Sequence, residues 1–280
     1  MTGITKKKVL SYLSLTVLLS APFYYLIISE GTLSGGGGLY VLGLMWAPGI
    51  SAILTRLYWQ RNLREMGWGW GKTRYQVSSY LFPVITGLAV YGFVWLAGFG
   101  DFSGESLTDE TVTSLPAAIG LMATLGVLFS SLSALGEELG WRGLLVPELA
   151  KLTSYTTVSI ICAVVWAFYH YPVLILADYN STAPIWYAFL MFTLSIGGVS
   201  FIATWLRLKS GSMWTGVILH ASHNLFIQGV FDGLTVDTGQ TEYVTTEFGI
   251  GLAVFYLAGG YWCWRHRGAL PQDELEGGIA

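Results

Sequence analysis

Two adjacent carboxylates and a guanidinium, Glu137, Glu138 and Arg142, stand together inside an apolar stretch of this chain. On a helix Glu138 and Arg142 lie one turn apart on one face, with the acid before the base, so we expect them to form an ion pair. Glu137 then points about 100° away and stays free for chemistry. A carboxylate in a low-dielectric site has a raised proton affinity, which suits a general base that works near neutral pH.

These acids could instead have a purely structural role, as part of a buried polar network that only fixes how the helices pack. Charged side chains inside a membrane cost about 2.5 to 3.5 kcal/mol each on insertion scales, so those that remain are functional candidates. A packing network does not require two adjacent acids. The pattern therefore favours chemistry at Glu137.

A histidine, His170, follows Trp166 by one helical turn in a later apolar stretch. A lone histidine on an apolar helix is more often a satisfied core residue than a functional one, so its spacing alone decides little. The aromatic ring of Trp166 lies on the same face and is expected to shield the imidazole from lipid.

Two further polar residues, His220 and Asn224, are one turn apart in a third apolar stretch and point the same way. Side chains of this kind can donate hydrogen bonds to a developing oxyanion, which a hydrolase acting on amides requires. His223 lies on a neighbouring part of the helix face, and we expect it to pack or to support the other two. His266, between two arginines near the C-terminus, is expected to be solvated or to lie at the lipid surface.

These groups can cooperate only if their helices bring them to one depth in the membrane. With a rise of about 1.5 Å per residue, the three depths agree only if the helix that carries Glu137 continues through Arg142 to about Leu149. Residues 137–142 are therefore predicted to be helical and inside the membrane. Gly136 and Gly140 would let a neighbouring backbone approach closely there.

The three clusters, in this order, resemble the motifs of the CPBP family, the intramembrane endopeptidases named for CAAX proteases and bacteriocin-processing enzymes and also called the Abi family. The family pattern has Glu-Glu-x-x-x-Arg, then an aromatic residue four positions before a histidine, then His-x-x-x-Asn, each on its own helix of an eight-helix protein. The matching residues here are Glu137, Glu138 and Arg142, then Trp166 and His170, then His220 and Asn224. The motifs cover roughly residues 115–230, and tryptophan at 166 replaces the more common phenylalanine.

The resemblance implies hydrolysis of a peptide bond inside the membrane. Glu137 and His170 would activate a water molecule, and His220 with Asn224 would stabilise the oxyanion. Glu138 with Arg142 would hold the base in position. The implied substrate is a membrane-associated peptide or protein, with a prenylated CAAX-type peptide among the candidates.

Members of the family have also been called metalloproteases, so a zinc-dependent version of the same enzyme is the first alternative. Glu137, His170 and His220 are the candidate ligands, and a bound zinc ion would activate the water instead. The sequence has no HExxH motif and gives no clear set of ligands. No cofactor is therefore expected, and the metal-free glutamate mechanism is favoured.

The elements that must position these residues are membrane helices, because 53% of the 280 residues are hydrophobic and only 11% are charged. Apolar runs long enough to span the bilayer predict an all-α polytopic membrane protein with about eight transmembrane helices. The runs are 9–29, 39–59, 77–98, 117–149 (overlong), 154–176, 184–206, 211–231 and 247–264. Residues 1–264 are expected to form a single transmembrane helical domain, with the motif-bearing core at about 115–230, and 265–280 are expected to form a hydrophilic cytoplasmic tail.

The charges between the predicted helices alternate in sign. Lysine and arginine occur at Lys6 to Lys8, between helices two and three, four and five, and six and seven, and after helix eight, while the alternate connections carry only acids. Cationic residues stay in cytoplasmic loops, so both termini are predicted to be cytoplasmic in a multi-pass protein of the cell membrane. Arg56, near the inner end of helix two, is expected to snorkel.

Other classes of protein are less consistent with the sequence. Intramembrane Glu, His and Arg also build proton relays, so a proton-coupled transporter is a second alternative, although the chain shows no paired halves. A non-catalytic scaffold or immunity protein is a third, disfavoured by the intact set of candidate residues. The two cysteines, Cys162 and Cys263, suggest neither a disulfide framework nor a metal site. No basic patch with interleaved aromatics or nucleotide-binding glycine loop indicates a nucleic-acid partner.

Overall fold

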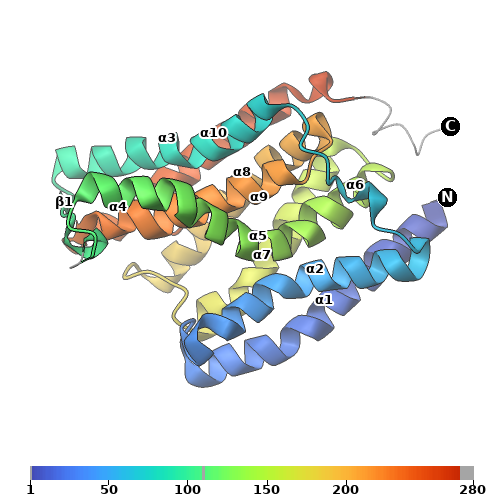
Figure 1. The fold of residues 1–280 in the computed structure, drawn as a ribbon, viewed down its shortest axis with the longest axis horizontal. Coiled ribbons are helices and arrows are strands. Elements are labelled where there is room, and N and C mark those ends of the chain that lie inside the picture. The colour runs from blue at the N-terminus through green and yellow to red at the C-terminus, as the bar shows by residue number, and fades with distance from the viewer. Residues whose placement is uncertain (1, 109–110, 272–280) are drawn as a thin grey trace.

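The computed structural model of the chain describes residues 2–108 and 111–271, and in this part almost all regular structure is helical (Figure 1). The longer elements are α1 (Thr2–Glu30), α2 (Leu39–Gln60), α3 (Thr73–Ala97), α4 (Leu115–Leu121), α5 (Val127–Gly140), α6 (Val146–Ala150), α7 (Tyr155–Leu176), α8 (Ile185–Ser210), α9 (Trp214–His223) and α10 (Ile250–Arg265). Elements α4, α5 and α6 form one continuous helix through the π-helical turns η4 (Met122–Gly126) and η5 (Trp141–Leu145). A third π-helical segment, η6 (Asn224–Phe231), continues α9.

Eight helical stretches correspond to the eight predicted apolar runs, and the all-α prediction is confirmed. In the described residues six of them are long and apolar enough to cross a membrane, namely 3–30, 35–60, 73–97, 115–150, 155–176 and 185–210. The stretch formed by α9 with η6 and the helix α10 are shorter. The protein is therefore a multi-pass membrane protein, with about eight as an approximate number of crossings.

The two small strands lie in the connections at one end of the helices. β1 (Gly100–Phe102) pairs antiparallel with β2 (Thr235–Asp237), so that Gly100 faces Asp237 and Phe102 faces Thr235. This ribbon ties the connection after α3 to the connection that follows η6. Both η6 and the pairing strands thus end at the same side of the molecule (Figure 1).

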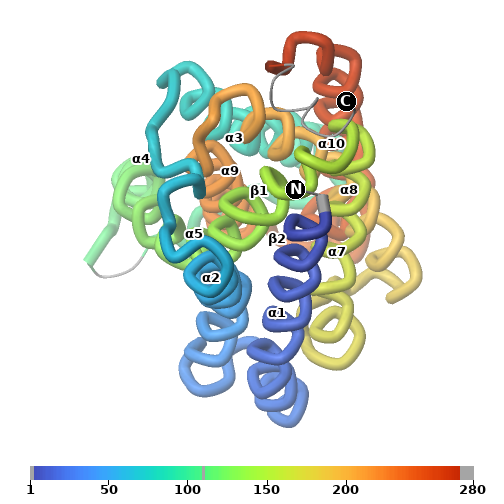
Figure 2. The backbone as a smooth tube through the Cα atoms, turned by 90° about the vertical axis from the view of Figure 1, so that its right-hand side faces the viewer, coloured from blue at the N-terminus to red at the C-terminus, as the bar shows by residue number. Residues whose placement is uncertain are grey.

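The N-terminal helices α1 and α2 form a hairpin that extends from the remaining helices, and α2 packs along α5 (Figure 2). This contact needs glycine. A Cβ atom at Gly136 would lie 2.7 Å from the Met45 carbonyl oxygen, and one at Gly140 would lie 2.7 Å from Cβ of Pro48. The close approach predicted from Gly136 and Gly140 is confirmed.

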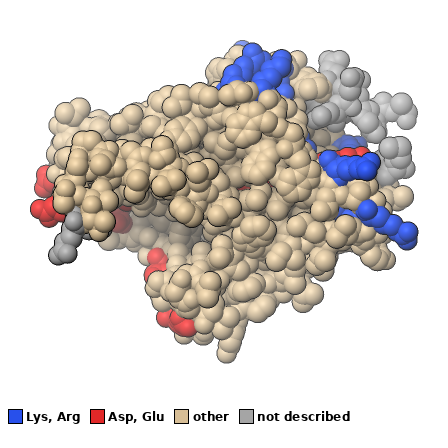
Figure 3. All heavy atoms as spheres, viewed as in Figure 1, with Lys and Arg blue, Asp and Glu red and all other residues tan. Residues whose placement is uncertain are grey.

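Basic and acidic side chains gather at opposite ends of the face in Figure 3. At the basic end a carboxylate from α6, Glu148, is fully buried. Its Oε1 lies 2.9 Å from Nζ of Lys151, 3.4 Å from Nζ of Lys8 and 3.8 Å from Arg56. The expectation that Arg56 snorkels is therefore wrong, because its guanidinium is buried between helices and paired with carboxylates. The cluster joins α1, α2 and α6.

The C-terminal helix α10 ends at Arg265, and a short 3₁₀ turn, η8 (Arg267–Ala269), follows it. Residues 272–280, which make up most of the predicted hydrophilic tail, lie outside the described residues.

Candidate active site

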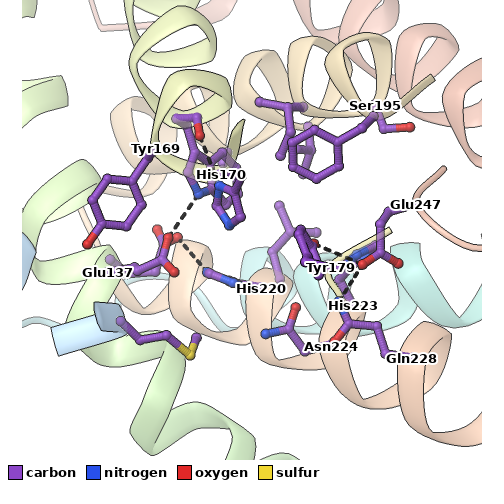
Figure 4. A pocket seen from close by; sticks show the side chains of 18 of the residues that line it. Glu137, Tyr169, His170, Tyr179, Ser195, His220, His223, Asn224, Gln228 and Glu247 are labelled. Carbon is purple, nitrogen blue, oxygen red and sulfur yellow. Dashed lines mark hydrogen bonds and ion pairs between the residues drawn. The ribbon is translucent and has the colours of Figure 1, made fainter. Parts of the chain in front are cut away.

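One cavity brings together all seven residues that the three motifs single out. Figure 4 labels Glu137, His170, His220 and Asn224 among them. The motif residues on its wall are Glu137, Glu138, Arg142, Trp166, His170, His220 and Asn224. They come from three separate helices, α5 with η5, α7, and α9 with η6. The helix that carries Glu137 runs from Leu115 to Ala150 without interruption, so the predicted helical continuation past Arg142 is confirmed.

Glu137 is held by two tryptophans. Its carboxylate is 2% exposed, and its Oε2 accepts hydrogen bonds from Nε1 of Trp141 at 3.0 Å and from Nε1 of Trp166 at 2.9 Å. Two donors on one oxygen fix the orientation of the carboxylate and offset part of the cost of burying it. The imidazoles of His170 and His220 both lie within electrostatic range of this carboxylate.

The predicted ion pair is present. Nη1 of Arg142 lies 2.8 Å from Oε1 of Glu138, and both side chains are buried. The same oxygen also contacts Nδ1 of His220 at 3.1 Å, and the Arg142 guanidinium lies 4.4 Å from the centre of the Trp166 ring. Glu138 therefore links the arginine of its own helix to the histidine of α9, which supports its predicted positioning role.

Hydrogen bonds fix the protonation pattern of the two imidazoles. Nδ1 of His170 contacts the carbonyl oxygen of Trp166 at 2.9 Å, so this nitrogen must carry the proton and Nε2 carries the lone pair of the neutral ring. Nε2 of His170 can thus accept a proton. Nδ1 of His220 likewise donates to Glu138, so that ring donates from Nε2 only when it also carries a second proton.

The remaining predicted residues are placed as follows. Asn224 lies one turn after His220, where α9 passes into η6, and faces the same cavity. His223 hydrogen-bonds through Nδ1 to the hydroxyl of Tyr256, in keeping with a supporting role. Trp166, predicted only as a shield for His170, packs edge-on against that imidazole at 6.2 Å and in addition binds Glu137.

Four residues of the site were missed by the sequence reasoning, three on the cavity wall and one, Trp141, behind it. Trp141 is the second donor to Glu137, and its spacing of four residues from that acid is a signal that could have identified it. The other three form a cluster across the cavity: Oε1 of Glu247 accepts hydrogen bonds from the Tyr179 hydroxyl at 2.9 Å and from Nε2 of Gln228 at 2.8 Å. Tyr179 and Glu247 lie in connections, where helical spacing gives no signal.

With this geometry in view, the chain can be compared with known proteins. Residues 119–226 match the family described as type II CAAX prenyl endopeptidase, Rce1-like. Over these residues the chain is similar to the CPBP family. Over 101 residues it is also 35% identical to the CAAX prenyl protease 2 of Methanococcus maripaludis, an alignment that covers 34% of this chain and 36% of that protein. The chain thus spans only about a third of the length of the relative it matches.

The CPBP match begins in α4 and ends in η6, so it contains all seven motif residues together with Trp141. Glu247 and the whole α1–α2 hairpin lie outside it. Gln228 lies two residues beyond its end. Two of the three residues of the cluster across the cavity, Gln228 and Glu247, therefore lie outside the match, and Tyr179 lies within it.

The candidate zinc ligands of the CPBP core do not fit a metal ion in this arrangement. Within residues 2–108 and 111–271 no three His, Cys, Asp or Glu side chains converge as a metal-binding group. Oε2 of Glu137 is already occupied by two N–H donors, which a metal ion would have to displace.

Proposed function

We propose that this protein is an intramembrane endopeptidase in which Glu137 and His170 activate a water molecule. The observation that carries the proposal is the placement of Glu137 under two indole donors in one cavity with His170, His220 and Asn224. Such a carboxylate is oriented in advance and shielded from competing donors, as a general base requires. Nε2 of His170 adds a second acceptor nearby.

The reaction divides among residues of the cavity. The water gives its proton to the Glu137 and His170 pair and attacks the scissile carbonyl carbon. The oxyanion that forms is stabilised by the side-chain amide of Asn224 and by the protonated ring of His220. When the carbon–nitrogen bond breaks, the proton held by the pair passes to the leaving amine, so that one water is consumed for each peptide bond cleaved.

We propose a membrane-associated substrate with a prenylated, CAAX-type end. The support is the relative named CAAX prenyl protease 2 and the family match of the central helices. The cavity is also suited to a lipid-like group, because much of its wall is apolar: Leu33, Val41, Leu44, Val173, Phe192 and Ile196. We further propose that the protein lies in the cell membrane with both termini in the cytoplasm, on the basis of the basic end of the molecule.

The test is cleavage of a prenylated, internally quenched CAAX-type peptide by the detergent-purified full chain. We expect cleavage by the wild type and its loss in Glu137→Ala and His170→Ala, both of which should remain folded and inserted. A zinc chelator should leave the rate unchanged, because no ligand set converges at Glu137. Wild-type rates in either variant would remove that residue from the mechanism, and loss of activity with chelator, restored by zinc, would establish the zinc-dependent version.

A further inference from the structure

A row of four polar side chains leads along one helix from the catalytic cluster to the acidic end of the molecule. The members of this polar row are His220, Asn224, Gln228 and Asp232, each four residues after the one before. Residues four apart share a face of an α-helix, and the wider turns of the π-helical η6 keep residues four to five apart on one face. The row therefore forms a continuous polar stripe.

Two cavities meet along this row. The first three members line the catalytic cavity, of about 180 Å³, and the last two line a second cavity of about 350 Å³. Gln228 belongs to both, together with Leu33, Tyr179 and Glu247. The second cavity is otherwise lined mainly by polar residues of the connections at the acidic end: Asn180, Asp232, Thr235, Asp237, Thr241, Glu242, Thr245 and Thr246.

The boundary between the cavities is polar. Glu247 is 5% exposed, and its Oε1 accepts the hydrogen bonds from Tyr179 and Gln228. Burial raises the pKa of Glu247, and it raises the pKa of Asp232 to about 7. Burying polar groups costs free energy unless they are hydrogen-bonded. Apolar side chains at this boundary would therefore stabilise the fold more. A polar boundary is instead what passage of water requires.

On the other side of the catalytic cluster α5 continues into η5, where Trp141, Leu144 and Leu145 are almost completely buried. The ion cluster around Glu148 follows in α6. The side walls are largely apolar. Water consumed in hydrolysis needs an entrance, and the polar row is the hydrogen-bonding path that the described residues offer to it.

We propose that the polar row, with Tyr179 and Glu247, is the route by which water reaches the catalytic cluster from the acidic end of the molecule. The inference rests on the proposed hydrolytic function, since it assigns the source of the attacking water. It concerns segments that lie largely beyond the family match, at Gln228, Asp232 and Glu247.

The first test measures access of water without measuring cleavage. Gln228→Cys is made in the full chain with Cys162 and Cys263, both buried, replaced by alanine, reconstituted in lipid nanodiscs and treated with a charged, membrane-impermeant thiol reagent. We expect it to react within about tenfold of the rate of Thr238→Cys, an exposed position at the same end. Leu88, on α3, is 56% exposed on the outer surface of the helices, where lipid would cover it. Leu88→Cys should therefore react far more slowly with a reagent that does not enter the membrane. Reaction of Gln228→Cys as slow as that of Leu88→Cys would overturn the proposal.

The second test measures turnover. Gln228→Leu should lower kcat at least tenfold with little change in KM, because water supply is impaired while the substrate still binds, and Gln228→Asn should restore most of the rate. Thr238→Leu is the control, since it adds the same apolar side chain outside both cavities. A wild-type kcat for Gln228→Leu would refute the route. If the protein cleaves no peptide but Gln228→Cys still reacts, the water route stands and the hydrolytic function is what fails.

Discussion

At the scale of single residues, the cavity shows how a carboxylate can be kept usable in an apolar setting. Both donors to Glu137 are indole N–H groups, which carry no charge and have no acceptor of their own. They can therefore hold Oε2 without taking part in proton transfer. An arginine or lysine in the same place would form an ion pair and would weaken the carboxylate as a base.

Trp166→Phe tests this arrangement, because phenylalanine keeps the ring and removes only the donor. A hydrogen bond to a charged group contributes about 1.5 to 3 kcal/mol, so kcat/KM should fall about ten- to a hundredfold while the protein stays folded. Trp186→Phe, at a largely exposed position on α8, should leave peptide cleavage unchanged. Wild-type kcat/KM in Trp166→Phe would show that the indole N–H does not position the base.

Glu138→Gln should lower stability and activity together. It leaves the buried Arg142 guanidinium without its ion-pair partner, and loss of one member of a buried pair typically costs about 3 to 5 kcal/mol. The measurement is the thermal unfolding midpoint in detergent, alongside peptide cleavage. Glu65→Gln is the matched control, since that carboxylate is 65% exposed in its contact with Arg56. If Glu138→Gln leaves both quantities unchanged, the pairing has no such role.

Much of the site at this scale was predictable from spacing. The Glu138 and Arg142 pair follows from i,i+4 geometry, and the meeting of Glu137 with His170 and His220 follows from matching their depths. The donors to Glu137 were not predictable in the same way. An indole N–H has to find a partner across a helix interface, and sequence spacing does not specify how helices are rotated against one another.

At the scale of the helices, the approach of α2 to α5 decides where Glu137 lies. Gly136 precedes that acid and has no side chain between the two backbones, so α5 lies directly against α2 one residue before Glu137. Just beyond it the helix passes into the π-helical turn η5, which contains Trp141 and Arg142. Turns of this kind are frequent at functional sites because they re-aim side chains without ending the helix.

Gly136→Ala should destabilise the protein. The added Cβ would lie 2.7 Å from the Met45 carbonyl oxygen and 2.8 Å from Cα of Trp46, and overpacking of this kind typically costs about 1 to 3 kcal/mol. Gly120→Ala on the same continuous helix is the control. A Cβ there meets nothing within 4 Å, so alanine should stabilise the helix slightly through its higher helix propensity. An unfolding midpoint for Gly136→Ala at or above that of the wild type would contradict the tight contact.

Apart from the start of α1, which lies at Thr2 and not at residue 9, the helices themselves were predicted to within a few residues. A run of apolar residues long enough to cross the bilayer has few other stable conformations. The π-helical turns were not predicted, since they depend on contacts with other helices. The role of Glu247 was also missed. Glu247 lies in a connection and reaches the cavity wall from there. Neither the length of an apolar run nor the spacing of residues along a helix predicts where a connection will lie.

At the scale of the whole molecule, the charges are divided between two ends. The acidic end holds carboxylates from several connections, and one of them, Asp232, is partly buried just past η6 and accepts a hydrogen bond from the hydroxyl of Tyr91. Burial raises its pKa from 3.8 to about 7, and the neighbouring carboxylates Glu247 and Glu242 act in the same direction. Folding therefore favours the protonated form of Asp232.

The stability of the protein should depend on pH through this group. Because the folded pKa lies above the unfolded one, the contribution is fully present below about pH 4 and is lost as the pH rises through about 7. The unfolding midpoint of the wild type should thus be higher at pH 5 than at pH 8. Asp232→Asn should show a smaller difference, and Asp101→Asn, exposed at the same end, an unchanged one. An equal difference in Asp232→Asn and the wild type would contradict the assignment.

The basic end bears on a different problem, the integrity of the membrane itself. A passage that admitted water at one face and released it at the other would let protons leak and would discharge the membrane potential. The cluster of Lys8, Arg56 and Lys151 around Glu148 ties three helices together beneath the cavity and places fixed positive charge there. Positive charge repels hydronium ions. The protein could therefore admit water from the acidic end without letting protons cross the membrane.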